Sequence, residues 1–509
     1  MKKILNYSLI AVLFFTASCD KNFDEINRNK TAPTSIDPVF QLNNALINIS
    51  FSGTTLMYEV GIVQQIVTPN SGVLTGANFN QDNRSNTQVD WQGWYRNVIR
   101  NTRDVISRTK DVPAQSNLMN MARIVQAYGF MLLTDTYGDI PYKQGGVGYL
   151  DQNFFPAYDP QQEIYTDLIK ELTEASAALN ATGKVETGDV LYGGNIAQWK
   201  KFGYSLLLRA GMRLSKVDAA KAQQVVQTAV QGGVITSNAD NAVLKHTSDY
   251  QQGMGSTLNS TEAANFYLAE PFVNYLKSTN DPRLSAIAIR YKGAKSGPEQ
   301  VPAIGTTNPA DQIGMPLGYD NAGITAVAAS KGLASFYDFS QLDRRRMAKV
   351  SAPVFYVTAA QTNLLLAEAR FRGWITTGTT EGYYNAGVRA HMEQLASYDP
   401  GSAVPASAID AYLAANPFDP SKALEQINTQ YWIASFLNGP EAWANFRRSG
   451  FPNLAPNPFP GKDLKTEAFI RRLTYPNSEI SVNKQNYEAA VARMGPDILD
   501  TRVWWDKKP

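Results

Sequence analysis

Apolar residues recur at intervals of three and four along much of the chain, which is the spacing of one face of an α-helix. The best example is a helix expected from residue 160 to about residue 179, with Asp159 as its N-cap, Pro160 at its first position and Gln162 at its third. Its apolar stripe consists of Ile164, Leu168, Leu172, Ala175 and Leu179.

The same spacing predicts seven further helices, the first of them with Asp90 as its N-cap. They span residues 91–105, 119–134, 196–216, 218–231, 354–373, 380–397 and 424–437. Short breaks between long helices favour antiparallel pairs, as in tetratricopeptide arrays, although no consensus repeat is visible. The chain is therefore predicted to be dominated by α-helices.

Two stretches lack this pattern. Residues 238–350 are rich in Gly, Asn, Ser and Thr, and residues 451–466 contain four prolines. We expect long loops in both. Long irregular segments of a compact protein are usually either functional or disordered.

The N-terminus has the form of an export signal. Lys2 and Lys3 precede an apolar run over residues 4–15, which is shorter than the roughly 20 residues that a membrane-spanning helix needs. Residues 1–18 are therefore predicted to be a signal peptide, followed by a polar tether over residues 19–38 and a body over residues 39–509.

Cys19 is the one cysteine of the chain, so no disulfide framework is expected. A buried structural thiol or a catalytic nucleophile would be alternatives, but the chain has only two histidines to act as a base. The sequence TASC at residues 16–19 resembles the bacterial lipobox, with Thr16 where leucine is usual. That resemblance implies that Cys19 carries a lipid anchor.

Charge and motifs narrow the possible functions. The 47 basic and 45 acidic residues give a net charge of +2, and the run at residues 344–346 lies beside Asp343, so nucleic-acid binding is not expected. We find no histidine-rich metal site, no calcium-loop spacing and no hydrolase or nucleotide motif. Asp135 and Asp139 could form a catalytic pair, but Asp139 stands in a turn sequence that favours a structural role. No catalytic residue, metal or cofactor is expected.

Six sequence segments carry a family resemblance. They are LLTDTYGDIPY (132–142), YDPQQEIYTDLIKELTEA (158–175), NDPRL (280–284), TNLLLAEAR (362–370), EAWANFRRSGFP (441–452) and RRLTYPNSEISVN (471–483). Together they resemble the SusD/RagB family of Bacteroidetes outer-membrane lipoproteins, in its SusD-like branch.

The resemblance implies about four tetratricopeptide-like helix pairs and an inserted, loop-rich ligand-binding lobe over residues 238–350. It implies a lipoprotein at the outer face of the outer membrane that binds oligosaccharides or peptides without cleaving them. Its partner would be a SusC-like, TonB-dependent barrel that faces the helix pairs. A helical scaffold that binds only proteins and a surface glycoside hydrolase are the alternatives.

A sugar binder needs aromatic rings for stacking and polar side chains for hydrogen bonds. Candidate ligand-binding residues are Phe79, Trp91, Tyr267 and Tyr319. Phe79 and Tyr319 stand in polar loops, whereas Trp91 and Tyr267 stand in helical patterns where packing is the competing interpretation. Ligand identity stays open, because sugars and peptides are both recognised by stacking and hydrogen bonding.

Overall fold

The computed structural model describes residues 36–50, 53–70 and 76–508. Cys19 and the predicted signal peptide lie outside the described residues, so cleavage, lipidation and the boundaries of the tether stay predictions. Residues Pro38–Pro509 form one compact unit. Within the described segments, no helix has both the length and the apolar character needed to span a bilayer.

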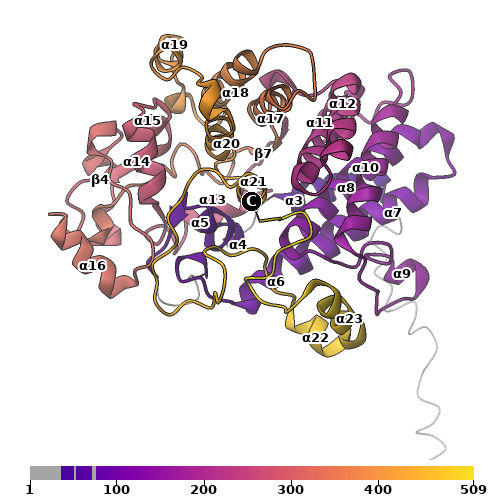
Figure 1. The fold of residues 1–509 in the computed structure, drawn as a ribbon, viewed down its shortest axis with the longest axis horizontal. Helices are drawn as coiled ribbons and strands as arrows, with labels where there is room; N and C mark the ends of the chain where they lie inside the picture. The colour runs from indigo at the N-terminus through magenta and orange to yellow at the C-terminus, as the bar shows by residue number, and fades with distance from the viewer. Residues whose placement is uncertain (1–35, 51–52, 71–75, 509) are drawn as a thin grey trace, which may run out of the picture. The chain divides into compact units, whose positions relative to one another are not determined.

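Helices dominate this unit (Figure 1). The first half contains α3 (Pro38–Ile49), α4 (Gly53–Met57), α5 (Glu59–Ile62), α6 (Arg84–Gly93), α7 (Arg100–Thr109), α8 (Ser116–Tyr137), α9 (Gly148–Asp151), α10 (Gln161–Ala178), α11 (Ile196–Arg213) and α12 (Ala219–Gly232). The second half contains α13 (Gly253–Leu258), α14 (Glu270–Ser278), α15 (Arg283–Ile287), α16 (Asn321–Ser330), α17 (Ala359–Phe371), α18 (Thr380–Gln394), α19 (Ala406–Ala415), α20 (Ala423–Ala434), α21 (Gly439–Ser449), α22 (Asn477–Val482) and α23 (Lys484–Met494).

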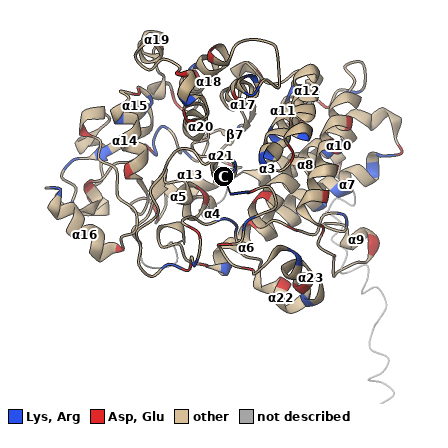
Figure 2. Cartoon of the chain, in the orientation of Figure 1, with Lys and Arg blue, Asp and Glu red and all other residues tan. Residues whose placement is uncertain are grey.

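Neighbouring long helices pack in pairs, as the sequence predicts. Helices α7, α8, α10, α11 and α12 pack each against the next, and Figure 1 shows them side by side. Helices α17 and α18 form a second close pair, and α20 and α21 follow. Lys, Arg, Asp and Glu are interspersed along these helices (Figure 2). The predicted helical, tetratricopeptide-like fold is confirmed.

Seven short strands accompany the helices in the described part of the chain. They are β1 (Ile66–Val67), β2 (Ala242–Leu244), β3 (Tyr267–Leu268), β4 (Ala288–Tyr291), β5 (Gly305–Thr306), β6 (Gln341–Leu342) and β7 (Val354–Val357). They form three antiparallel sheets in the orders β1-β3, β2-β7 and β5-β4-β6. Residues 238–350 are therefore less irregular than predicted, since short helices and strands interrupt their loops.

One predicted helix begins too early. Residues 354–357 form β7 rather than the first turn of a helix, because Val-Phe-Tyr-Val suits a fully buried strand. Helix α17 then starts at Ala359 with a capping box, in which Thr358 Oγ1 accepts from Gln361 N–H and the Gln361 side chain accepts from Thr358 N–H.

Two predicted N-caps are wrong. Asp90 lies inside α6, whose N-cap is Asn83, and the helical run continues through a π-helical turn at Trp94–Ile99 into α7. Asp159 does not cap α10 either; its Oδ2 accepts from the backbone N–H groups of Tyr142 and Lys143. The carboxylate at the start of α10 comes from Asp139, whose Oδ1 accepts from Gln161 N–H at 2.8 Å.

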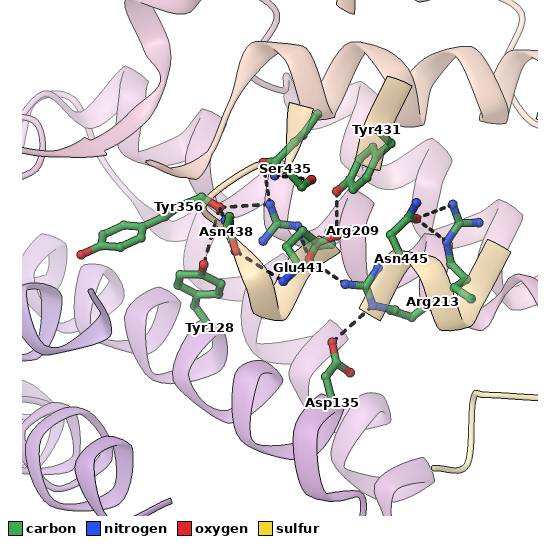
Figure 3. Close-up of polar contacts among 12 residues, drawn as sticks. Tyr128, Asp135, Arg209, Arg213, Tyr356, Tyr431, Ser435, Asn438, Glu441 and Asn445 are labelled. Carbon is green, nitrogen blue, oxygen red and sulfur yellow. Dashed lines mark hydrogen bonds and ion pairs between the residues drawn. The ribbon is translucent and has the colours of Figure 1, made fainter. Parts of the chain in front are cut away.

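A fully buried ion network joins the helix pairs (Figure 3). Arg213 Nη2 of α11 lies 2.6 Å from Glu441 Oε2 of α21, and its Nε lies 3.2 Å from Asp135 Oδ2 of α8. Arg209 Nε lies 3.2 Å from the same Glu441 oxygen, and Tyr431 donates to the other. Burial alone would raise the pKa of Glu441, but the two guanidinium groups hold it below its ordinary value.

Candidate functional site

Three loops that are distant in sequence meet at Asn78. Its buried side-chain Nδ2 donates to Thr68 O at 2.7 Å and to Tyr319 O at 3.0 Å. Its Oδ1 accepts from Gly318 N–H at 2.8 Å. One amide therefore joins the loop at residues 76–82 to the loop at residues 317–320.

Asn457 brings in the proline-rich loop. Its Nδ2 donates to Ala77 O at 3.1 Å and to Asn78 O at 2.7 Å, and its Oδ1 accepts from Phe459 N–H at 3.0 Å. The Phe459 ring then stacks on Phe79, with ring centroids 4.1 Å apart and an interplanar angle of 9°. We call the segments 76–82, 317–320 and 455–463 together the loop junction.

Backbone geometry limits which residues the junction accepts. Gly318 has a φ of 82°, and a Cβ there would lie 2.8 Å from Asn457 Oδ1, so glycine is required for two reasons. Asn80 also has a positive φ, 49°, and its carbonyl accepts from Asp463 N–H. Asp463 Oδ2 in turn accepts from Asp82 N–H at 2.7 Å.

Two aromatic rings reach the surface at the edge of the junction, while its amides stay buried. Phe459 and Tyr319 are each partly exposed, whereas Phe79 is 4% exposed. The Nδ2 of the buried Asn80 has no hydrogen-bond partner among the described residues. Partly exposed rings among polar loops suit a ligand with flat apolar faces and hydroxyl or amide edges.

The four predicted ligand residues separate into two groups. Phe79 and Tyr319 both lie at the loop junction, where ligand contact stays a prediction. Tyr267 lies on strand β3 rather than on the expected helix; it is fully buried, and its hydroxyl donates to Ala264 O. Burial raises the pKa of Tyr267.

Trp91 is also interior. Its ring is 5% exposed and lies 5.0 Å from Tyr95, 5.1 Å from Tyr137, 6.1 Å from Tyr158 and 5.7 Å from Tyr475, measured between centroids. With rings on several sides, Trp91 packs in the core, which is the competing interpretation given in the sequence analysis. Its ring has no free face for a ligand in this structure.

Sequence reasoning missed three residues of the junction: Asn78, Asn457 and Phe459. The available signals were the Asn-Phe-Asn triplet at residues 78–80 and the Asn-Pro-Phe-Pro run at residues 457–460. Asparagine side chains commonly bond to the backbone of loops. The sequence does not show that these two loops meet.

The two carboxylates considered for catalysis have structural partners. Asp135 Oδ1 accepts from Tyr165 Oη and Trp505 Nε1, and Asp139 pairs with Arg493 at 2.6 Å besides its contact with α10. In the part of the chain that the structure describes, no three His, Cys, Asp or Glu side chains gather as a metal site would require.

Comparison with known proteins identifies relatives of this architecture. The model of a SusD-like family, described as "Starch-binding associating with outer membrane", matches residues 29–476. No curated protein sequence matches significantly. Among solved structures, a chitin-binding protein is 30% identical and superposes with a TM-score of 0.81, covering 93% of this chain and 100% of its own.

Two further solved structures share the fold. A SusD homologue from Bacteroides uniformis is 26% identical with a TM-score of 0.75, over 92% of this chain and 99% of its own. A chitin-binding SusD homologue from Flavobacterium johnsoniae is 24% identical with a TM-score of 0.76, over 93% and 99%.

Proposed function

The chain belongs to the SusD-like family of outer-membrane-associated binding proteins, and we propose that it captures oligosaccharides at the cell surface and passes them to a SusC-like, TonB-dependent barrel. The family is one of non-catalytic binding proteins, so the ligand is bound and released intact. The observation that carries the proposal is the loop junction, where the partly exposed rings of Phe459 and Tyr319 stand among polar loop groups.

Chito-oligosaccharides are the first ligand class to test, because the similar structure at 30% identity is a chitin-binding protein. An N-acetylated sugar offers apolar CH faces to the two partly exposed rings, and its amide and hydroxyl groups suit the polar groups of the surrounding loops. Peptides remain the competing ligand class, since they present rings and amides of the same chemistry.

A thermal-shift screen of the non-lipidated Cys19→Ser variant against a glycan panel and a peptide mixture tests this. A ligand present at 100 times its Kd should stabilise the protein by about 2.7 kcal/mol. Phe459→Ala should weaken binding at least tenfold, and Tyr250→Ala, an exposed tyrosine away from the junction, should not. Peptide binding alone, or equal effects of both variants, would contradict the proposal.

We also propose that Cys19 is acylated and holds the protein on the outer membrane. A buried methylene contributes about 0.8 kcal/mol, so two or more acyl chains anchor a protein firmly. Cys19→Ser should move the protein to the soluble fraction and abolish palmitate incorporation. A variant that stays with the membrane and still incorporates palmitate would disprove the anchor.

Contact with the barrel is the third part of the proposal. The segment that joins α8 to α10 exposes four large apolar side chains close together in sequence: Tyr149, Leu150, Phe154 and Phe155. The amides of Asn483 and Asn486 donate to Pro156 O and Phe155 O, which fixes this segment in place. Several large apolar side chains exposed on one short segment are typical of a protein-interaction surface.

Replacing Phe154 and Phe155 together by serine should reduce co-purification with the barrel from solubilised outer membranes. Phe371→Ser is the matched control, because Phe371 is also exposed but lies at the end of α17. If the double variant recovered as much barrel as the native protein, these side chains would not be part of the interface.

A further inference from the structure

Two adjoining clefts lie between helix α10 and the C-terminal segment. Their volumes are about 500 and 490 Å³, and they share Gln162, Trp504 and Lys507 as lining residues. The second cleft extends toward the start of α12, where Lys216 and Lys221 line it. We call the second cleft the lysine cleft; none of its lining residues belongs to the loop junction.

The lysine cleft holds more positive charge than its own carboxylate balances. Lys216, Lys221 and Lys507 all line it, and none of them forms an ion pair with a described residue. Its one acidic lining residue, Asp218, already accepts from Lys221 N–H as the N-cap of α12. The nearby Asp506 is paired with Arg502.

Lys216 is the most confined of the three lysines. Burial lowers its pKa, attraction by Asp506 partly offsets this, and repulsion from three arginines lowers it further. The arginines are Arg448, Arg471 and Arg502. A half-buried ammonium group among like charges is stabilised by any anion that enters the cleft beside it.

Trp504 supplies a flat apolar surface in the same cleft. Its ring is partly exposed and lies 6.3 Å from the buried Tyr165 ring, between centroids, at an angle of 47°. The adjacent Trp505 donates to Asp135, and Arg502 pairs with Glu467, so the C-terminal segment is held in place on both sides of Trp504. The ring is therefore positioned before any ligand arrives.

We propose that the lysine cleft is a second binding site, which takes an acidic sugar residue bearing a carboxylate or sulfate group. The sugar ring would stack on Trp504, and its anionic group would be held by Lys216 and Lys507. A volume near 490 Å³ lies within the usual range of small-ligand pockets, roughly 300–1,000 Å³, which favours a sugar over an extended protein surface.

Isothermal titration of the full-length Cys19→Ser chain with a galacturonic acid trisaccharide tests the proposal, with the neutral galactose trisaccharide as the control ligand. Binding of the acidic sugar should exceed that of the neutral one at least tenfold and should weaken as salt is added, because salt screens partly exposed charges. Equal binding of the two sugars, or no binding of the acidic one, would overturn it.

Variants then locate the site. Lys216→Gln combined with Lys507→Gln should weaken the acidic sugar at least tenfold, whereas Lys422→Gln, at an exposed lysine elsewhere, should not. Trp504→Leu should weaken binding of the acidic sugar but not binding of free sulfate ions. Phe459→Ala at the loop junction should leave acidic-sugar binding unchanged. The experiment therefore tests the lysine cleft separately from the ligand site proposed at the loop junction. Tighter binding of an acidic peptide, lost in the same lysine variants, would overturn the sugar assignment.

Discussion

The buried ion network and the loop junction both join segments that are far apart in sequence, but they use opposite chemistry. In the network, charged groups such as Arg213 and Glu441 meet with almost no exposure. At the junction, the neutral side-chain amides of Asn78 and Asn457, which are also buried, bond to backbone carbonyls of loops. The network involves four long helices, whereas the junction involves loops and one short 3-10 turn at Gly76–Asn78.

This difference in chemistry fits the role that we expect of each region, which is stability for the network and ligand binding for the junction. A buried ion pair tolerates little displacement, because an unpaired charge in the interior is costly, so it fixes helix positions. A side-chain amide that bonds to backbone favours one loop arrangement by only about 1 kcal/mol per bond, so the loops can adjust around a ligand at small energetic expense. We expect stability to depend on the network and binding to depend on the junction.

The largest effect should come from Glu441→Gln. It leaves Arg209 and Arg213 buried beside a neutral group, and loss of one partner of a buried pair costs about 3–5 kcal/mol. Urea unfolding measures this. Glu488→Gln is the control, since Glu488 pairs with Lys484 on the exposed surface and should change stability by less than about 1 kcal/mol. If both variants lost a similar amount of unfolding free energy, the buried network would not contribute more to stability than an exposed ion pair.

The second-largest effect should be a loss of folding stability at acid pH, through the buried Glu368 of α17. Burial alone would raise the pKa of Glu368, but Arg448 and Arg372 lower it from 4.5 to about 2. A lowered folded-state pKa gives stability that is present above pH 4.5 and is lost as the pH falls toward 2. At 1.4 kcal/mol per pKa unit, this contact contributes roughly 3 kcal/mol.

Urea unfolding at several pH values between 7 and 2.5 measures that loss. Glu368→Gln should be less stable than the native protein at pH 7 and should lose less stability on acidification. Parallel pH curves for the two proteins would show that other groups govern acid sensitivity.

At the junction, Asn78→Ala should cost about 1–3 kcal/mol, because it leaves buried backbone groups unsatisfied. Ligand binding should fall at least tenfold, since Tyr319 and Gly318 lose their link to the loop at residues 76–82. Unfolding and ligand titration measure the two effects. Asn48→Ala, at a partly exposed site in α3 where the amide bonds only within its own helix, is the control. If Asn78→Ala bound the ligand as tightly as the native protein, the loop junction would not be part of the ligand site.

The smallest effect on stability should come from Tyr319→Ala. The ring is partly exposed, so its loss should change the unfolding free energy by less than about 1 kcal/mol while ligand affinity drops. Phe79→Ala should behave differently, because that ring is covered by Phe459 and its removal leaves a gap in the junction. A stability loss at Tyr319 as large as at Phe79 would show that Tyr319 serves packing.

The sequence by itself determined where most of the longer helices lie, although it did not predict shorter ones such as α14, α16, α19 and α23. Periodic apolar positions located α8, α11, α12 and α18 within a few residues, because helix formation depends on neighbours three and four positions apart. The start of α12 was located within one residue, and the structure shows that Asp218 caps it by a bond within its own first turn.

Only the tertiary structure decided the contacts between distant segments. Asp139 supplies the carboxylate at the start of α10, and Asn457 bonds to Ala77 across 380 positions of sequence. Local periodicity carries no information about such meetings, because a loop of any composition can bond to any backbone group that packing brings near. The loop junction and the lysine cleft are therefore products of packing, although every side chain in them is visible in the sequence.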